Sequence, residues 1–88
     1  MTWSVRLAKE AANQLKELPP DRQEFVLSHL RAMKDDPFSG DLVRLKGQQG
    51  KGRFRKRVGR YRLIFTPYYS EHVIEISQIL IRSEKTYR

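Results

Sequence analysis

The chain has 88 residues, no cysteine and a formal net charge of +8 at pH 7, because 18 Lys or Arg outnumber 10 Asp or Glu. This length predicts a single small domain spanning residues 1–88, and the lack of cysteine excludes a disulfide framework and a thiolate metal site. No apolar run approaches the roughly 20 residues of a membrane span, and no signal peptide is recognisable, so we expect a cytoplasmic protein.

The first forty residues predict one short strand followed by two helices. Apolar and polar residues alternate over 3–7, which is typical of a strand with one buried face. The apolar spacing then becomes helical over 7–18, where Pro19-Pro20 ends the helix. A second amphipathic helix is predicted over 21–33. Because the link between the helices is short, we expect them to pack as an antiparallel hairpin.

The second half predicts a loop and three strands. Residues 35–52 are rich in glycine and are interpreted mostly as loop, with 42–45 as a candidate ordered stretch. Strands are predicted over 53–58, 60–66 and 72–80. The last run has too many apolar residues for simple alternation, so we interpret it as an inner strand covered on both faces. The order β-α-α-β-β-β predicts an α+β fold, in which the helical hairpin packs on one face of a twisted, mainly antiparallel sheet.

The positive charge is concentrated in one segment. Residues 42–70 contain nine Lys or Arg and no Asp or Glu, whereas the rest of the chain is close to neutral. A localised excess of this kind predicts a binding site for a polyanion. Nucleic acid is favoured over a membrane surface, because the segment is predicted as strand and not as an amphipathic helix.

The spacing inside this segment predicts a β-hairpin with Gly59-Arg60 as its two-residue loop. The cross-strand pairs would then be Val58 with Tyr61, Arg57 with Arg62, and Arg55 with Ile64. Strand alternation places the three arginines of these pairs on one face, and the apolar side chains, Tyr61 and Lys56 on the core side. Like charges directly across a strand pair are destabilising by roughly a few tenths of a kcal/mol. The arrangement therefore favours a bound polyanion, and no role follows for Lys56.

Three stretches of the chain resemble the RelE/ParE superfamily of bacterial and archaeal toxins: Leu45-Lys46-Gly47, residues 54–65, and residues 82–88. The similarity covers nearly the whole chain, including strand order and length. Members of this family are the toxic halves of toxin–antitoxin pairs. The resemblance favours the RelE branch and implies a ribosome-dependent endoribonuclease, an mRNA interferase that needs no cofactor or metal. The alternative is a ParE-like toxin that inhibits DNA gyrase without catalysis.

In the RelE branch a basic concave sheet binds the message, and Lys, Arg and Tyr side chains replace the usual His pair of a ribonuclease. By position, the residues of this site correspond to Arg55, Arg57, Arg62, Arg82 and Tyr87. Four more basic residues of the acid-free segment are expected to contact nucleic acid: Lys46, Lys51, Arg53 and Arg60. The implied reaction is attack of a ribose 2′-hydroxyl on the adjacent phosphorus, and guanidiniums suit the charge that builds on the phosphate oxygens.

The group that moves the proton stays open. Arginine remains protonated in proteins and is a poor general base. Tyr87 in a positive field is a candidate to accept the 2′-hydroxyl proton, and it could equally orient the message or stack on a base. His29 and His72 have no carboxylate at a suggestive spacing, so a His-based mechanism has low support.

The expected partners are mRNA, the ribosome and a cognate antitoxin. The antitoxin should be acidic and largely disordered alone, because a strongly basic surface favours an anionic segment that folds on binding. A basic nucleic-acid-binding regulator without toxicity would need only the basic patch and is a third interpretation.

Overall fold

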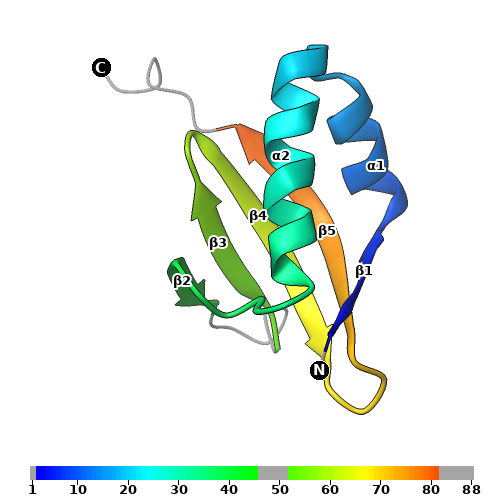
Figure 1. Ribbon diagram of the computed structural model, residues 1–88, viewed down its shortest axis with the longest axis vertical. Coiled ribbons are helices and arrows are strands. Elements are labelled where there is room, and N and C mark those ends of the chain that lie inside the picture. The colour runs from blue at the N-terminus through cyan, green and yellow to red at the C-terminus, as the bar shows by residue number, and fades with distance from the viewer. Residues whose placement is uncertain (1, 46–51, 82–88) are drawn as a thin grey trace.

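The computed structural model describes residues 2–45 and 52–81 (Figure 1). In chain order the elements are β1 (Ser4–Leu7), α1 (Lys9–Lys16), α2 (Pro20–Met33), β2 (Asp41–Arg44), β3 (Phe54–Val58), β4 (Tyr61–Tyr68) and β5 (Val73–Ile81). The predicted α+β order is confirmed, with one strand more than the sequence pattern predicts. That strand is β2, at the candidate ordered stretch inside the predicted loop.

The strands form one mixed sheet in the order β1-β5-β4-β3-β2. The pairs β5-β4, β4-β3 and β3-β2 are antiparallel, whereas β1 pairs parallel to β5. Figure 1 shows both helices on the same side of this sheet, with α2 in front of its centre and β2 and β3 projecting beyond it. No helix of the described residues covers the other face, so its side chains are open to binding in this part of the chain.

Two prolines set the boundary between the helices. Pro20 occupies the first turn of α2, where a missing N–H removes no hydrogen bond of the helix. Gln23 closes the junction, because its Nε2 donates to the carbonyl oxygen of Leu18 at 2.8 Å. The helical hairpin predicted from the short link is thus present. Among the helices that the structure describes, none is long and apolar enough to cross a membrane.

The core lies between the helices and the sheet. The side chains with no exposed surface come from α1, α2, β4 and β5: Ala11, Val26, Leu63, Phe65, Ile74 and Ile76. Burying a large apolar side chain of this kind stabilises the fold by roughly 1.5–3 kcal/mol. Tyr61 is 3% exposed and belongs to the same cluster, which confirms its predicted place on the core side.

The prediction that the last strand is an inner one is confirmed, because β5 lies between β1 and β4. Its predicted cover on both faces is not found among the described residues, whose helices pack on one face alone. Ile76 pairs with Phe65 and Gln78 with Ile64, which leaves Ser77 without an opposite residue. This is a β-bulge, and the Ser77 hydroxyl donates to the carbonyl oxygen of Ile64 at 3.2 Å. The extra residue turns Ile79 into the core beside Ile76. The apolar-rich pattern of β5 therefore reflects a shift in alternation, and Leu80 is exposed on the open face.

Candidate nucleic-acid interface

The open face of the sheet carries the arginines predicted for it. Arg57 lies directly opposite Arg62, and Arg55 lies opposite Ile64, so the predicted hairpin register is confirmed. Because side chains alternate along a strand, all three guanidiniums project from the side without helices. We call this side the arginine face, after Arg55, Arg57 and Arg62.

The strand pairing arranges the arginine face in rows that run across the sheet. One row contains Asp41, Arg57, Arg62 and Leu80, and the next contains Val43, Arg55, Ile64 and Gln78. Neighbouring rows are two residues apart along each strand, or about 6.8 Å. Arg62 and Arg55 are therefore each bordered by an aliphatic side chain, which reduces the water around the cations.

Arg62 has the least satisfied guanidinium of the described residues. The side chain is half-buried, and its Nε is fully buried without a hydrogen-bond partner among the described atoms. A buried donor without an acceptor costs roughly 1–3 kcal/mol, and more when the group is charged. A phosphate above this row would match the geometry of the guanidinium.

Asp41 places a carboxylate at the end of the same row. Its Oδ2 lies 3.7 Å from Nε of Arg57, and the two side chains are 57% and 41% exposed. An ion pair this exposed contributes only about 0–1 kcal/mol. The sequence did not indicate this contact, because Asp41 precedes the acid-free segment and the pairing of β2 with β3 was not predicted.

A second polar cluster occupies the other end of the open face. The Tyr68 hydroxyl donates to Oε1 of Glu75 at 3.2 Å. Nε of Arg6 lies 3.8 Å from Oε2 of Glu75, and the Arg6 guanidinium carbon is 5.8 Å from the centroid of the Tyr68 ring. The carboxylate of Glu75 is thus held by its own neighbours, and it does not oppose the arginines one or two rows away.

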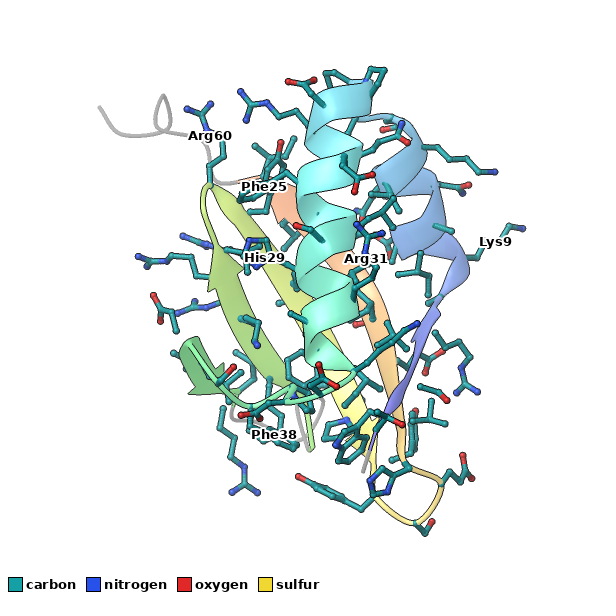
Figure 2. The ribbon with its side chains drawn as sticks, viewed as in Figure 1. Lys9, Phe25, His29, Arg31, Phe38 and Arg60 are labelled. Carbon is teal, nitrogen blue, oxygen red and sulfur yellow. The ribbon has the colours of Figure 1, made fainter. Side chains whose placement is uncertain are left out.

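The remaining predicted residues divide into two groups. Arg53 directly precedes β3, and Leu45 donates its N–H to the Arg53 carbonyl oxygen at 2.9 Å. Arg60 is exposed in the hairpin turn, at the tip seen in Figure 2. Four of the predicted residues lie outside the described part of the chain and stay predictions: Lys46, Lys51, Arg82 and Tyr87.

The two rows of the arginine face contain no His or Lys, and their carboxylate is that of Asp41, which pairs with Arg57. Among residues 2–45 and 52–81, the one group with a clearly shifted pKa is Lys56. Burial lowers the pKa of its amine, and the negative charge of Asp36 partly offsets this effect. Lys56 pairs with Leu63 and projects toward the core side, so it does not reach the arginine face. Within the same ranges, no three His, Asp or Glu side chains come together as a metal site. The described interface therefore presents guanidiniums that suit a phosphate.

Comparisons with known proteins agree with this fold. No protein-family profile matches the chain. It is 28% identical, over its full length and 98% of the relative, to a protein of Methanocaldococcus jannaschii provisionally named toxin RelE1. It also superimposes on a chain of the archaeal RelE–RelB complex from Pyrococcus horikoshii, with a TM-score of 0.77 and 26% identity over 96% of this chain and 99% of that one. In sequence and in fold, the chain therefore resembles RelE toxins of the RelE/ParE superfamily over nearly its whole length.

Other RelE structures share the fold at lower identity. A chain of the RelBE2 toxin–antitoxin complex from Mycobacterium tuberculosis matches this chain with a TM-score of 0.83 and 23% identity, over 93% of this chain and all of that one. The isolated RelE toxin of Escherichia coli matches with a TM-score of 0.74 and 13% identity, over 93% and 86% of the two chains. These chains therefore share the fold although their sequences have little identity with this one.

Proposed function

We propose that this RelE-like protein is the toxin of a toxin–antitoxin pair and acts as an mRNA endoribonuclease. The observation that carries the proposal is the pair of Arg57 and Arg62, held side by side on an open sheet face with a guanidinium nitrogen of Arg62 buried and unpaired. A fold that keeps two cations adjacent gains nothing from their repulsion. The pair is explained if a phosphate binds between them.

The proposed cleavage uses the RNA's own nucleophile. The 2′-oxygen forms a bond to the adjacent phosphorus, the bond from phosphorus to the 5′-oxygen breaks, and the products carry a 2′,3′-cyclic phosphate and a 5′-hydroxyl. The 2′-hydroxyl proton leaves to a base, and the departing 5′-oxygen takes up a proton. Arg57 and Arg62 bind the non-bridging oxygens as their charge increases, a contribution of roughly 10²–10³-fold for one well-placed donor. Arg55, one row away, binds a neighbouring phosphate.

Proton transfer and positioning involve more than the described face. Tyr87 is our candidate for the proton acceptor, with Arg82 as a further phosphate ligand. The ribosome would hold the message in line for attack, since positioning alone can supply a large part of the acceleration. Cleavage is therefore expected to depend on translation, and purified protein should leave naked RNA intact.

An antitoxin is the proposed protein partner. Two structures that resemble this chain are of complexes with an antitoxin or a RelB protein. Residues 42–70 have nine basic and no acidic residues, so an acidic antitoxin segment would be attracted to this part of the chain. Covering the arginine face would block access of the message.

Inhibition of DNA gyrase without catalysis is the second candidate. The observation in its favour is that the cations of the described arginine face are guanidiniums, which are poor general bases. The scaffold would then act only by binding.

Expression in a growing cell, followed by primer extension on translated mRNA and by analysis of plasmid topology, separates the two. Breaks at fixed codon positions that disappear in an Arg57→Met, Arg62→Met double variant support the nuclease. Intact mRNA together with relaxed or cleaved DNA would contradict the nuclease and support inhibition of gyrase. A double variant that cuts as well as the wild type would remove the arginine face from the mechanism.

A further inference from the structure

Lys56 is a buried cation on the side of the sheet opposite the arginine face. Its residue is only 7% exposed, and it lies on β3 between Phe54 and Val58 of the same face. Among the residues that the structure describes, its amine makes neither a hydrogen bond nor an ion pair. The Nζ atom itself is not fully buried, so water in the adjoining groove hydrates the ammonium, and an anion that replaced this water would pair with it.

The amine lines a groove of about 350 Å³ between α2, the turn before β2, and β3. We call this the amine groove, and its polar lining comprises His29, Asp36, Ser39, Asp41, Lys56 and Arg57. Figure 2 shows His29 projecting from α2 toward the strands on this side. Lys56, His29 and Asp36 lie on the helix side of the sheet, and the groove meets the arginine face at its rim, where Asp41 and Arg57 line both.

The carboxylates of the amine groove already have partners. Oδ1 of Asp36 accepts the N–H of Phe38 at 3.0 Å, and Oδ2 of Asp41 lies 3.7 Å from Nε of Arg57. The charge of Asp36 favours the ammonium form of Lys56, but the two form no ion pair. The Lys56 amine is therefore a donor in the groove for which the described residues supply no hydrogen-bond acceptor.

We propose that the amine groove binds a carboxylate, presented as the side chain of an Asp or Glu by a partner protein. A carboxylate suits the site better than a phosphate, because it has one negative charge and so meets less repulsion from Asp36 and Asp41. Its two oxygens would accept from the ammonium of Lys56 and, when His29 carries a proton, from that imidazole as well.

A second hollow beside the amine groove favours a protein segment over a free small acid. It has a volume of about 400 Å³ and is lined by Asp21, Arg22, Phe25, Gly59, Arg60 and Tyr61. The two hollows share Gly59, and the Phe25 side chain beside it is 38% exposed. A segment along α2 would place an apolar side chain on Phe25 and an acidic one on Lys56, flanked by the cations of Arg22 and Arg60.

The identity of the partner as the antitoxin rests on the proposed function, whereas the carboxylate site does not. A bound carboxylate stabilises the ammonium form, so binding raises the pKa of Lys56. The affinity therefore falls as the pH rises through that pKa.

The first test uses acetate as the probe and the free full-length chain. Sodium acetate is titrated against sodium chloride at constant ionic strength, and NMR follows the Lys56 Cε and His29 ring signals. We expect saturable shifts with acetate, a higher pKa of Lys56 at saturation, and no saturable response in Lys56→Met. The matched control is Lys9→Met, because Lys9 is exposed and lies at the right-hand edge of Figure 2, across α2 from His29. This variant should respond to acetate as the wild type does.

An Asp36→Asn variant keeps Lys56 in place and tests the same site if Lys56→Met fails to fold. Removing the neighbouring negative charge is expected to tighten acetate binding several-fold, while the amide oxygen still accepts the Phe38 N–H. Shifts that are absent, that chloride reproduces, or that keep the same midpoint in Lys56→Met would overturn the carboxylate site.

The second test uses the antitoxin encoded beside this chain. Lys56→Met should weaken the toxin–antitoxin complex about tenfold and leave mRNA cleavage unchanged, because the amine is on the other side of the sheet. If the wild type binds acetate but Lys56→Met binds the antitoxin as tightly as the wild type does, the proposal that a protein segment occupies the groove is overturned. The groove would then be a site for small carboxylates. A chain that shows no toxicity would refute the proposed function, and the acetate result would still decide the carboxylate site.

Discussion

Arg57 and Arg62 lie directly opposite each other on adjacent antiparallel strands, on the face of the sheet that no helix covers. Among the described residues, Asp41 at the end of the row is the one acid that pairs with either arginine, through an exposed contact with Arg57. The repulsion between the two cations thus opposes folding. The Nε of Arg62, which is buried and has no hydrogen-bond partner among the described atoms, adds to this cost. Removing one arginine of the pair should therefore raise the free energy of unfolding and lower the cleavage of mRNA.

Replacing Arg62 with Met tests this opposition. Removal of one cation is expected to raise the free energy of unfolding by roughly 0.2–1 kcal/mol at low salt, with a smaller gain at high salt. Cleavage of translated mRNA should fall by roughly 10²–10³-fold, because a donor to the transition-state oxygens is lost. Urea denaturation and primer extension measure the two effects. Arg31→Met, on the exposed surface of α2, is the control and should keep full cleavage. A variant that is less stable and fully active would contradict the functional interpretation of the pair.

Replacing Asp41 with Asn should strengthen RNA binding. The change releases Arg57 from its ion pair and removes a negative charge from the arginine face. An exposed pair is worth at most about 1 kcal/mol, so we expect the affinity for a short single-stranded RNA to rise by up to roughly fivefold. The dependence on salt should steepen by up to about one released counterion. Fluorescence anisotropy over a salt series measures both, with Glu17→Gln at the C-cap of α1 as the control. Weaker binding by the Asn variant would show that Asp41 positions Arg57 for the RNA.

Replacing Lys56 with Met should alter how stability depends on pH. Burial lowers the pKa of Lys56 in the folded protein below its ordinary value of 10.5. The unfolded chain therefore binds more protons between the two pKa values, and the wild-type protein gains stability as the pH rises through that window. The Met variant lacks this gain. At neutral pH, where the buried ammonium is a penalty, the variant should melt higher, by about 4–8 °C if roughly 1 kcal/mol is recovered.

Thermal denaturation of the wild type and the variant from pH 7 to 11 isolates the effect of Lys56, because all other titrating groups are shared. The difference in melting temperature should shrink toward high pH. A constant difference would mean that the change comes from packing and not from the charge.

The hairpin was predictable because its information is local. Gly59 fixes the turn, and once the turn is fixed every residue from Phe54 to Phe65 has its partner and its face. The bulge at Ser77 was not predictable in this way, because nothing in the alternation of β5 distinguishes an inserted residue from burial on both sides. Only the pairing with β4 reveals it.

The contacts of the candidate site that were missed are non-local. β2 has four residues and follows a glycine-containing loop, so its pairing and the Asp41–Arg57 contact depend on where that loop returns to the sheet. Lys56 was assigned to the core side correctly, but strand parity says nothing about the groove that α2 leaves above it. Faces were therefore predictable from the sequence, whereas the grooves between elements were not.

Replacing Gly59 with Ala should destabilise the hairpin that carries the arginines. Gly59 has a φ of +60°, a conformation that costs an L-residue roughly 1–2 kcal/mol. An added Cβ would also lie 3.0 Å from Cζ of Phe25, closer than an ordinary contact. We expect the melting temperature to fall by about 4–8 °C for each kcal/mol lost.

A double-mutant cycle with Phe25→Leu separates the two causes. In the Leu background the ring atoms that the new Cβ would meet are absent, so the crowding disappears while the backbone strain stays. Gly59→Ala should therefore be less costly in Phe25→Leu than in the wild type, yet still destabilising. Equal costs in both backgrounds would assign the whole effect to the turn. A cost that vanishes would instead mean that Phe25 alone enforces glycine at the tip of the strands bearing Arg57 and Arg62.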